Sequence, residues 1–439
     1  MTTQQRAIRG TKLILIASAL CLGVLGAGEA PAGGLLLYEV GTADIGLASA
    51  GWGARAQDAS AVFTNPAGMT RLEGSQALLG VQALYGDYGF SIVPGTSSSL
   101  GTGDGGNPIG WFPGGGAFFS YSASPDLKFG FAMTGNLGLS NKYDEDWVGR
   151  YHVQESTLLG VSLLPSAAYR VTDKFSLGGS LNIMYGTLKN QVAVNNVAPS
   201  LADGRLKLDD NTWGVGVNLG LLYELSSETR FSLTYNSQID LDFKAPAEFA
   251  NLGPGLETLL RSRGLLNANV DLGITVPQQA MFSVFHQVNP RWAVLGSLGW
   301  QQWSKFGKVE VSVDSNDPTS LTKELNFKDT WHFAAGAQYR LSDPWLLNFG
   351  VAYDSKFQSG STVSPTLPVN DAWRFGAGVQ NQVSKAFSWG VATEYAYGGT
   401  LDVDKQSDVP VVLGGRGNLV GSYPDTGIFF LAANFNWVF

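Results

Sequence analysis

The sequence of 439 residues predicts an all-β protein: a transmembrane antiparallel β-barrel of about 14 strands with an N-terminal hatch, or plug, in its lumen. Three observations favour this fold. Apolar and polar residues alternate along most of the chain, short and long connections follow each other in turn, and charged residues are scarce. Together these features are typical of barrels whose strands face lipid on one side and an enclosed lumen on the other.

The alternation is clearest in the stretch 231–244. Its odd positions from Phe231 to Phe243 are apolar except for Ser237, and its even positions are polar. A β-strand points alternate side chains to opposite faces, so one face of this stretch is apolar. A soluble sandwich could contain such a strand, but its length suits a tilted strand that crosses a bilayer, which needs ~9–11 residues.

The composition agrees with a membrane barrel. Charged residues make up 15% of the chain and aromatic residues 12%, with 56 glycines. Soluble domains contain about 25% charged residues. The formal net charge of −8 argues against a nucleic-acid partner.

The first element in chain order is a predicted export signal, residues 1–32. Arg6, Arg9 and Lys12 form a basic end, and the apolar run 13–27 that follows is too short to span a bilayer as a helix. Ala30-Pro31-Ala32 fits a cleavage site, so we expect the mature chain to begin at Gly33. The only cysteine, Cys21, lies within this signal.

Residues 33–74 form the second predicted unit. They are rich in Gly and Ala, contain no clear strand, and precede the first alternating segment. Such a segment can hang below a barrel or fold into its lumen. Its apolar residues, among them Leu37, Trp52 and Phe63, favour burial in the lumen as a hatch.

Residues 75–439 are predicted to form the barrel. We expect strands near 75–88, 114–122, 127–139, 156–171, 174–188, 212–225, 229–243, 273–288, 291–303, 327–341, 345–356, 371–383, 386–403 and 427–439. Their connections alternate between tight turns, such as Thr172-Asp173 and Asn289-Pro290, and long loops near 89–113, 140–155, 189–211, 244–272, 304–326, 357–370 and 404–426. Short turns on one side and long loops on the other are the plan of outer-membrane barrels.

Aromatic residues support the membrane assignment. Trp292 and Trp303 bracket one predicted strand, and their spacing gives a rise of about 26 Å, close to the ~25 Å apolar band between aromatic girdles. The last strand carries aromatic residues on one face and ends in Phe439. This ending resembles the assembly signal of bacterial outer-membrane proteins.

The sequence offers little support for catalysis. His332 shares the polar face of its strand with Gln338 and Arg340, which favours a place in the lumen or in a polar network. No metal-ligand spacing, nucleophile motif or carboxylate pair stands out, so we expect no enzyme activity, no cofactor and no metal. A general porin needs a charged lumen, whereas inward rows such as Ser388, Gly390 and Ala392 are small or apolar.

One long loop contains a predicted short helix. Leu256, Leu259 and Leu260 have the i, i+3, i+4 spacing of one helix face. On an outward loop, this apolar patch is either a capture site for a hydrophobic ligand or a surface that contacts other loops.

The chain resembles the long-chain fatty acid transporter family (FadL/TodX type). The resemblance lies in the start at Gly33-Gly34-Leu35 and in Asn65-Pro66-Ala67. Further matching segments are 130–139, 221–225, 233–235 with 242–244, 276–277, 300–306, 327–329 and 434–439.

The resemblance implies a barrel plugged by a hatch, and a route for the ligand. A hydrophobic molecule is captured at the outer loops, enters an apolar pocket and leaves sideways at a kink in the third strand. On this basis Leu35 contacts the ligand, and the hatch residues Asn65, Pro66 and Ala67 brace the hatch against the kink. The kink would be formed by Gly135, Asn136 and Gly138, and glycines within a strand are where bulges arise.

The family also implies two basic residues that hold a carboxylate. Lys323 matches one of them, while the other position falls on Val192, with Lys189 as the nearest base. A carboxylate in an apolar pocket needs a charged partner. An aromatic or alkane hydrocarbon is therefore the alternative ligand class.

We expect a monomeric channel in the bacterial outer membrane that takes up long-chain fatty acids or similar hydrophobic compounds passively. Its partners would be the hydrophobic ligand, outer-membrane lipid and the barrel-assembly machinery. The competing classes are a diffusion porin and a structural or adhesive barrel.

Overall fold

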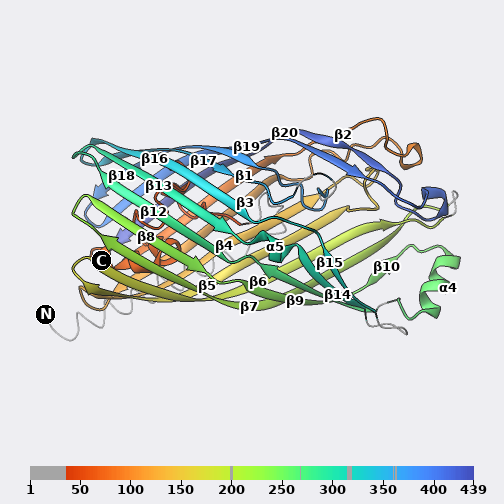
Figure 1. Cartoon of the computed structure of the whole chain (residues 1–439), viewed down its shortest axis with the longest axis horizontal. Coiled ribbons are helices and arrows are strands. Elements are labelled where there is room, and N and C mark those ends of the chain that lie inside the picture. Colours follow the sequence, from red (N-terminus) through yellow and green to blue (C-terminus); the bar gives the residue numbers. More distant parts are fainter. Residues whose placement is uncertain (1–35, 198–200, 267, 314–318, 359, 361–362) are drawn as a thin grey trace. The chain divides into compact units, whose positions relative to one another are not determined.

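The computed structural model describes residues 36–439 except 198–200, 267, 314–318, 359 and 361–362. Leu35 and the predicted signal 1–32 lie outside the described residues. Within them, fourteen strands close into an antiparallel barrel, because the first strand pairs with the last from Gln76 and Val438 to Asp87 and Gly427 (Figure 1). In ring order these strands are β1 (Gln76–Asp87), β3 (Gly110–Ser122), β4 (Leu127–Lys142), β5 (Glu155–Thr172), β6 (Phe175–Val194), β7 (Gly204–Glu224), β8 (Thr229–Asn236), β12 (Gln279–Gln287), β13 (Trp292–Gln301), β16 (Thr330–Ser342), β17 (Trp345–Asp354), β18 (Ala372–Ser384), β19 (Phe387–Lys405) and β20 (Leu419–Val438).

The wall has an apolar outer face and a small or polar inner face. In β7, Val215 and Leu219 are 60% and 52% exposed, whereas Asn218 between them is 1% exposed. A side chain on one face of a strand meets lipid, and its neighbour meets the interior. The alternation predicted from the sequence is therefore present in the wall.

The two ends of the barrel differ. Short turns join the strands at one end, the turn end, where Phe439 donates its backbone N–H to Ser75 O (2.8 Å) (Figure 1). The opposite end, the loop end, carries longer excursions. Within them lie β2 (Ser91–Ile92), η2 (Ser98–Leu100), β10 (Glu248–Ala250), α4 (Pro254–Ser262) and η4 (Val411–Leu413). None of the described helices is both long and apolar enough to pass through a membrane.

The predicted loop 189–211 is mostly strand. The β6–β7 ladder continues without interruption to the pair Val194 and Gly204. Antiparallel partners satisfy each other's backbone groups, so the hairpin can extend beyond the length that a bilayer requires.

The stretch 231–244 is two strands, not one. β8 ends at Asn236, and the chain restarts as β9 (Ile239–Pro246) in a separate four-stranded sheet with β11 (Asn269–Val276), β14 (Lys308–Val313) and β15 (Thr319–Glu324). Leu233 on β8 is 47% exposed, whereas Leu241 on β9 is fully buried. The apolar side thus changes from the lipid-facing exterior to the interior at the break. The predicted strand 273–288 divides likewise, into β11 and β12.

The spacing had predicted that Trp303 belongs to an aromatic girdle, but the structure places it in the interior. It begins the short helix α5 (Trp303–Phe306), is 3% exposed and stacks on Phe357 with ring centroids 4.8 Å apart. Trp300 on β13 pairs in register with Trp331, which is 47% exposed. The outward tryptophans at this level are therefore Trp300 and Trp331.

Residues 36–72, here called the inner segment, contain α2 (Thr42–Gly46), α3 (Ala61–Thr64) and η1 (Pro66–Arg71). A methyl group added to Gly376 of β18 would lie 2.2 Å from Ile45 O, and one added to Gly178 of β6 would lie 2.3 Å from the backbone nitrogen of Ala67. Six strands separate β6 from β18 in either direction around the ring. The inner segment therefore contacts opposite sides of the inner wall.

Three glycines in register form a smooth strip on the inner wall. Gly336 pairs with Gly350, and Gly350 pairs with Gly376. A methyl group at Gly350 would lie 2.0 Å from the backbone of Leu47. Only glycine leaves room for the backbone of the inner segment to approach the backbone of the wall this closely.

Candidate functional site

A pocket lies between the inner segment and the wall, and we call it the apolar pocket. Its cavity has a volume of about 100 Å³. Leu36 and Tyr38 of the inner segment form part of its lining, and Leu139, Trp303 and Phe357 come from the wall and from the connections at the loop end. Its composition suits an apolar ligand with a polar head, because a few polar groups interrupt the apolar lining.

His332, Asp354 and Arg374 form the polar end of the apolar pocket. The Nδ1 atom of His332 lies 2.6 Å from Asp354 Oδ1, and Arg374 Nε donates to the other carboxylate oxygen of Asp354. His332 is 2% exposed, which agrees with the lumen position expected from its strand face.

Arg374 also ties the inner segment to the wall. Its Nη1 donates to Glu39 Oε1 (2.7 Å) and to Glu394 Oε1 (2.8 Å), and both glutamates are fully buried. One guanidinium therefore faces three carboxylates, including that of Asp354. Removing a partner from such a buried network is strongly destabilising, by ~3–5 kcal/mol in known cases, because a charge is left without compensation.

The inner segment carries an ion pair of its own. Arg55 Nη1 donates to Asp44 Oδ1 at 2.7 Å, and both side chains are buried. Burial raises the pKa of Asp44 to about 6, although the nearby Arg55 guanidinium acts in the opposite direction. The ion pair joins two parts of the inner segment to each other. Arg230 of β8 joins the segment to the wall, because it donates to the backbone carbonyls of Ala54 (2.5 Å) and Arg55 (2.6 Å).

Asn65, Pro66 and Ala67 are buried between α3 and the wall. The Asn65 amide donates to Gly53 O (2.9 Å) and to Leu221 O of β7 (3.1 Å), and its Oδ1 accepts from the backbone N–H of Ala67 (3.0 Å). A methyl group at Gly220 of β7 would lie 2.0 Å from Asn65 Oδ1. These contacts brace the segment against β6 and β7.

The third wall strand, β4, is interrupted by a bulge. Its register with β5 shifts between Gly135 and Leu137, which leaves Asn136 as the extra residue. Asn136 Oδ1 accepts from Ser162 Oγ of β5 at 2.9 Å. Bulges bend a strand and end its regular pairing, and this one lies at the position predicted for the kink.

The wall opens beside this bulge. The β3–β4 ladder ends at the pair Gly116 and Thr134, although β3 reaches Gly110 and β4 continues to Lys142. Beyond Thr134, β4 forms a ladder with β5 alone among the described residues, until Lys142 at its end donates its N–H to Pro108 O just before β3 (2.8 Å). Two wall strands thus part on the side where the bulge lies.

The start of the inner segment covers the bulge from within. Leu36 forms an antiparallel bridge with Leu137, and Leu37 donates its N–H to Asn136 O (3.0 Å). The contact with the bulge therefore comes from Leu36 and Leu37, whereas Asn65 to Ala67 lie against β6 and β7. Leu36 and Leu139 both line the apolar pocket, so the pocket reaches the part of β4 that has separated from β3.

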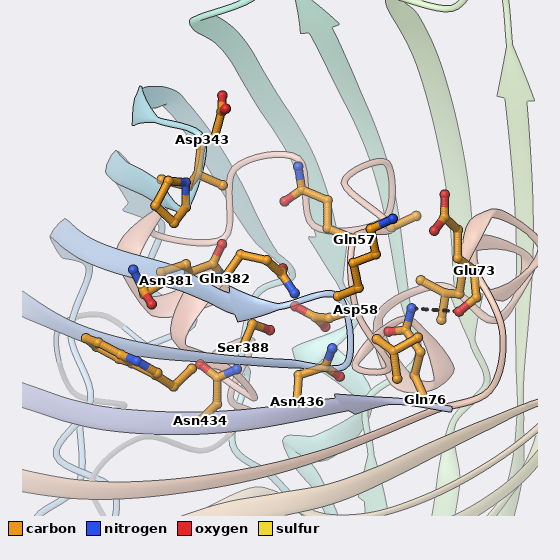
Figure 2. Close-up of a pocket in the computed structure, with 18 of the residues that line it drawn as sticks. Gln57, Asp58, Glu73, Gln76, Asp343, Asn381, Gln382, Ser388, Asn434 and Asn436 are labelled. Atoms are coloured by element: carbon orange, nitrogen blue, oxygen red, sulfur yellow. Dashed lines mark hydrogen bonds between the residues drawn. The ribbon is translucent and has the colours of Figure 1, made fainter.

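A second, polar cavity lies at the turn end and has a volume of about 610 Å³. Figure 2 shows its amide, hydroxyl and carboxyl side chains around one space between the inner segment and the wall. Gln57 and Asp58 come from the inner segment, and Ser388, Asn434 and Asn436 from β19 and β20. The inner segment thus has an apolar pocket on one side and a polar cavity at the turn end.

Of the two predicted basic residues, Lys189 is not among the residues that line the apolar pocket. Lys189 lies on the same side of β6 as the outward Leu181 and Tyr185, and its Nζ is 2.7 Å from Glu155 Oε1. Lys323 lies in β15 opposite Val309, and its side chain is outside the described part of the structure.

The predicted helix in the long loop is present as α4. None of its residues is buried, and Leu259 is 51% exposed. Leu256, Leu259 and Leu260 stand at the loop end, apart from the residues that line the apolar pocket. A separate cavity of about 430 Å³ beside this helix is lined by Phe249, Leu252 and Leu266 among others.

Sequence reasoning missed Arg374, Glu39 and Asp354. They lie apart in the sequence, and only the closed barrel with the inner segment inside it brings them together. The one signal was an arginine on the inner face of a strand, which needs a buried partner. In the described residues, no cluster of His, Cys, Asp or Glu side chains is suited to hold a metal ion.

A family model described as outer membrane protein transport protein (OMPP1/FadL/TodX) matches residues 23–439. The long-chain fatty acid transport protein of Escherichia coli strain K12 is 27% identical over 428 residues, which cover 90% of this chain and 94% of that protein. Outer membrane protein P1 of Haemophilus influenzae is 27% identical over 405 residues, covering 80% and 83%.

Solved structures share the fold. A FadL homologue of Pseudomonas aeruginosa has a TM-score of 0.80 at 21% identity and covers 93% of this chain and 100% of its own. The toluene transporter TodX of Pseudomonas putida has a TM-score of 0.67 at 16% identity, with coverage of 91% and 98%.

Proposed function

The chain belongs to the OMPP1/FadL/TodX family of outer membrane transport proteins, and we propose that it takes up long-chain fatty acids or similar hydrophobic compounds by passive diffusion. Transfer of an apolar chain from water releases ~0.8 kcal/mol per buried CH₂ group, so uptake down a gradient needs no ion or nucleotide. The named relatives support a transport role over an enzymatic one.

The single observation that carries the proposed route is the parting of β3 and β4 beside the bulge at Asn136. In this route the ligand is captured at the loop end, where α4 exposes Leu259, and then enters the apolar pocket. It leaves sideways into the membrane between β3 and β4.

The inner segment acts as the hatch in this proposal. Leu36 lines the apolar pocket and bridges Leu137 at the bulge, so one residue touches both the pocket and the gap. A cavity of about 100 Å³ is smaller than an engineered cavity of ~150 Å³ that accommodates benzene, so a long chain requires Leu36 to move. Displacement of Leu36 would enlarge the pocket and uncover the gap in one step.

A hydrocarbon is the second candidate ligand. It is favoured by the carboxylates of Glu39, Asp354 and Glu394 near the pocket, which disfavour a further anion, and by the outward position of Lys189. The names of the relatives favour a fatty acid instead. Lys323 remains the predicted carboxylate partner.

Uptake of radiolabelled oleate by cells that lack their own fatty acid channel would test the proposal. We expect expression of this chain to restore uptake. Absence of restoration for oleate, and for dodecane measured in parallel, would contradict the proposed function. Mass spectrometry of the small molecule that copurifies with the protein would decide between the two ligand classes.

A further inference from the structure

The polar end of the apolar pocket contains two hydrogen-bond acceptors without a partner among the described residues. His332 Nε2 is buried and unpaired, and so is Asn370 Oδ1. Both residues line the same pocket. Buried polar atoms in proteins are nearly always paired, so two unpaired atoms in one pocket point to a group that is absent from the protein itself.

The chemistry of each acceptor follows from its neighbours. Asp354 bonds to Arg374 and, when ionised, only accepts, so Nδ1 of His332 carries a proton. In the neutral imidazole, Nε2 is then a buried acceptor of a residue that lines the pocket. Asn370 donates its amide to the carbonyls of Gly398 (2.6 Å) and Thr400 (3.1 Å), so its free Oδ1 is an acceptor as well.

The charges around this end disfavour an anionic ligand. Arg374 is the one cation in the described cluster, and Glu39, Asp354 and Glu394 all bond to it. Arg374 is therefore already shared among three carboxyl groups. A ligand carboxylate would find no unshared cation to meet it at this end of the pocket.

We propose that His332 and Asn370 form a head-group site that selects an apolar molecule with an uncharged hydroxyl group, such as a long-chain alcohol, a phenol or a protonated fatty acid. This inference deepens the proposed function and rests on it. The hydroxyl proton is donated to His332 Nε2 or to Asn370 Oδ1, while the apolar part lies against Leu36, Trp303 and Phe357.

A purely structural role for His332 does not explain why its Nε2 has no hydrogen-bond partner. Its ring lies against Tyr38 with centroids 4.7 Å apart and its Nδ1 is paired, so the imidazole is held in one orientation. Packing alone gives no reason to leave Nε2 buried without a hydrogen-bond partner. The fixed ring with one free nitrogen is the arrangement of a positioned acceptor.

Binding of three probes of equal length tests this site. The purified full-length protein is equilibrated by dialysis with radiolabelled 1-dodecanol, dodecane or dodecanoate at pH 8, where the acid is ionised. We expect wild-type protein to bind 1-dodecanol about threefold to tenfold more tightly than dodecane, as one net hydrogen bond implies. Dodecanoate should bind more weakly than 1-dodecanol.

His332→Phe should abolish the preference for 1-dodecanol and leave dodecane binding unchanged, whereas His332→Gln, which keeps an acceptor, should retain part of it. His286→Phe is the matched control, because His286 lies exposed on β12 and bonds to Thr229 (2.8 Å). Heat-modifiable migration on gels checks that each variant folds.

Two outcomes would overturn the head-group site: an equal affinity of wild-type protein for 1-dodecanol and dodecane, or a preference for dodecanoate. Either result, with dodecane binding intact, leaves the proposed transport function standing. Failure of all three probes to bind, together with absent uptake in cells, would instead contradict the proposed function itself.

Discussion

At the scale of single residues, Asn65 illustrates what the sequence shows and what it does not. Its place in Asn65-Pro66-Ala67 marked it as important through resemblance alone. The structure adds its partners, Gly53 O in the inner segment and Leu221 O in β7, which is 156 positions away in the sequence. A pattern of residues cannot name a partner that only the closure of the barrel brings near.

Replacing Asn65 by Ala should reduce uptake at least fivefold. The change leaves the buried carbonyls of Gly53 and Leu221 and the N–H of Ala67 without their partner, and each unsatisfied group costs about 1–3 kcal/mol. The measurement is the initial rate of oleate uptake, with heat-modifiable migration to show that the barrel is intact. Asn381→Ala, at the turn-end cavity, is the control and should transport normally. An unchanged rate in Asn65→Ala would remove this residue from the hatch.

At the scale of elements, the sequence predicts strands well and their surroundings less well. Each of the fourteen wall strands overlaps its predicted range, because one side of each meets lipid and period-two alternation reports this directly, although the ends of β7, β8, β12 and β20 differ by several residues. Apolar residues stand at odd positions both before and after Ser237, yet they face lipid in β8 and the interior in β9. Alternation tells that a strand has two faces, but it does not tell what lies against each face.

The contact between the inner segment and β4 gives a prediction at this scale. Leu36 and Leu137 are directly opposite in an antiparallel bridge, which places their Cα atoms roughly 4.5–5.5 Å apart, within the range of a disulfide. The double variant Leu36→Cys with Leu137→Cys should lose uptake under oxidising conditions and regain it after reduction. Cys21, in the predicted signal, is the only native cysteine of the chain, so the engineered pair should form without competition in the mature protein.

Each single cysteine variant controls for the loss of the leucine side chain and should transport equally with and without reductant. Transport by the oxidised double variant, once its disulfide is verified by mass spectrometry, would show that Leu36 does not need to leave the bulge.

At the scale of the whole molecule, closure was predictable and the filling of the lumen only partly so. An even number of strands with tight turns at one end implies a closed ring, and the ring is closed by β1 and β20. The apolar residues of the N-terminal region suggested burial, but the network around Arg374 could not be predicted, because it joins charges from the inner segment, β17 and β19.

A filled lumen predicts that the protein excludes small polar solutes. Liposomes that contain the purified protein should swell in arabinose or glucose no faster than liposomes without protein, because Ile45, Leu47 and Val62 of the inner segment are fully buried between the walls. An open porin serves as the positive control. Rapid sugar flux through the wild-type protein would identify a diffusion porin and contradict the hatch.

The strip of Gly336, Gly350 and Gly376 has a consequence for exchanging parts between relatives. These positions lie some three hundred residues after Leu47 and Ile45, yet a single methyl group at Gly350 or Gly376 would collide with the backbone there. The path of the leading segment and the bare surface of this patch of wall therefore depend on each other. A chimaera that joins the leading segment of this chain to the barrel of a relative should assemble only if that barrel has glycine at the equivalent wall positions. Gly336, Gly350 and Gly376 are therefore the first positions to transfer together with the segment.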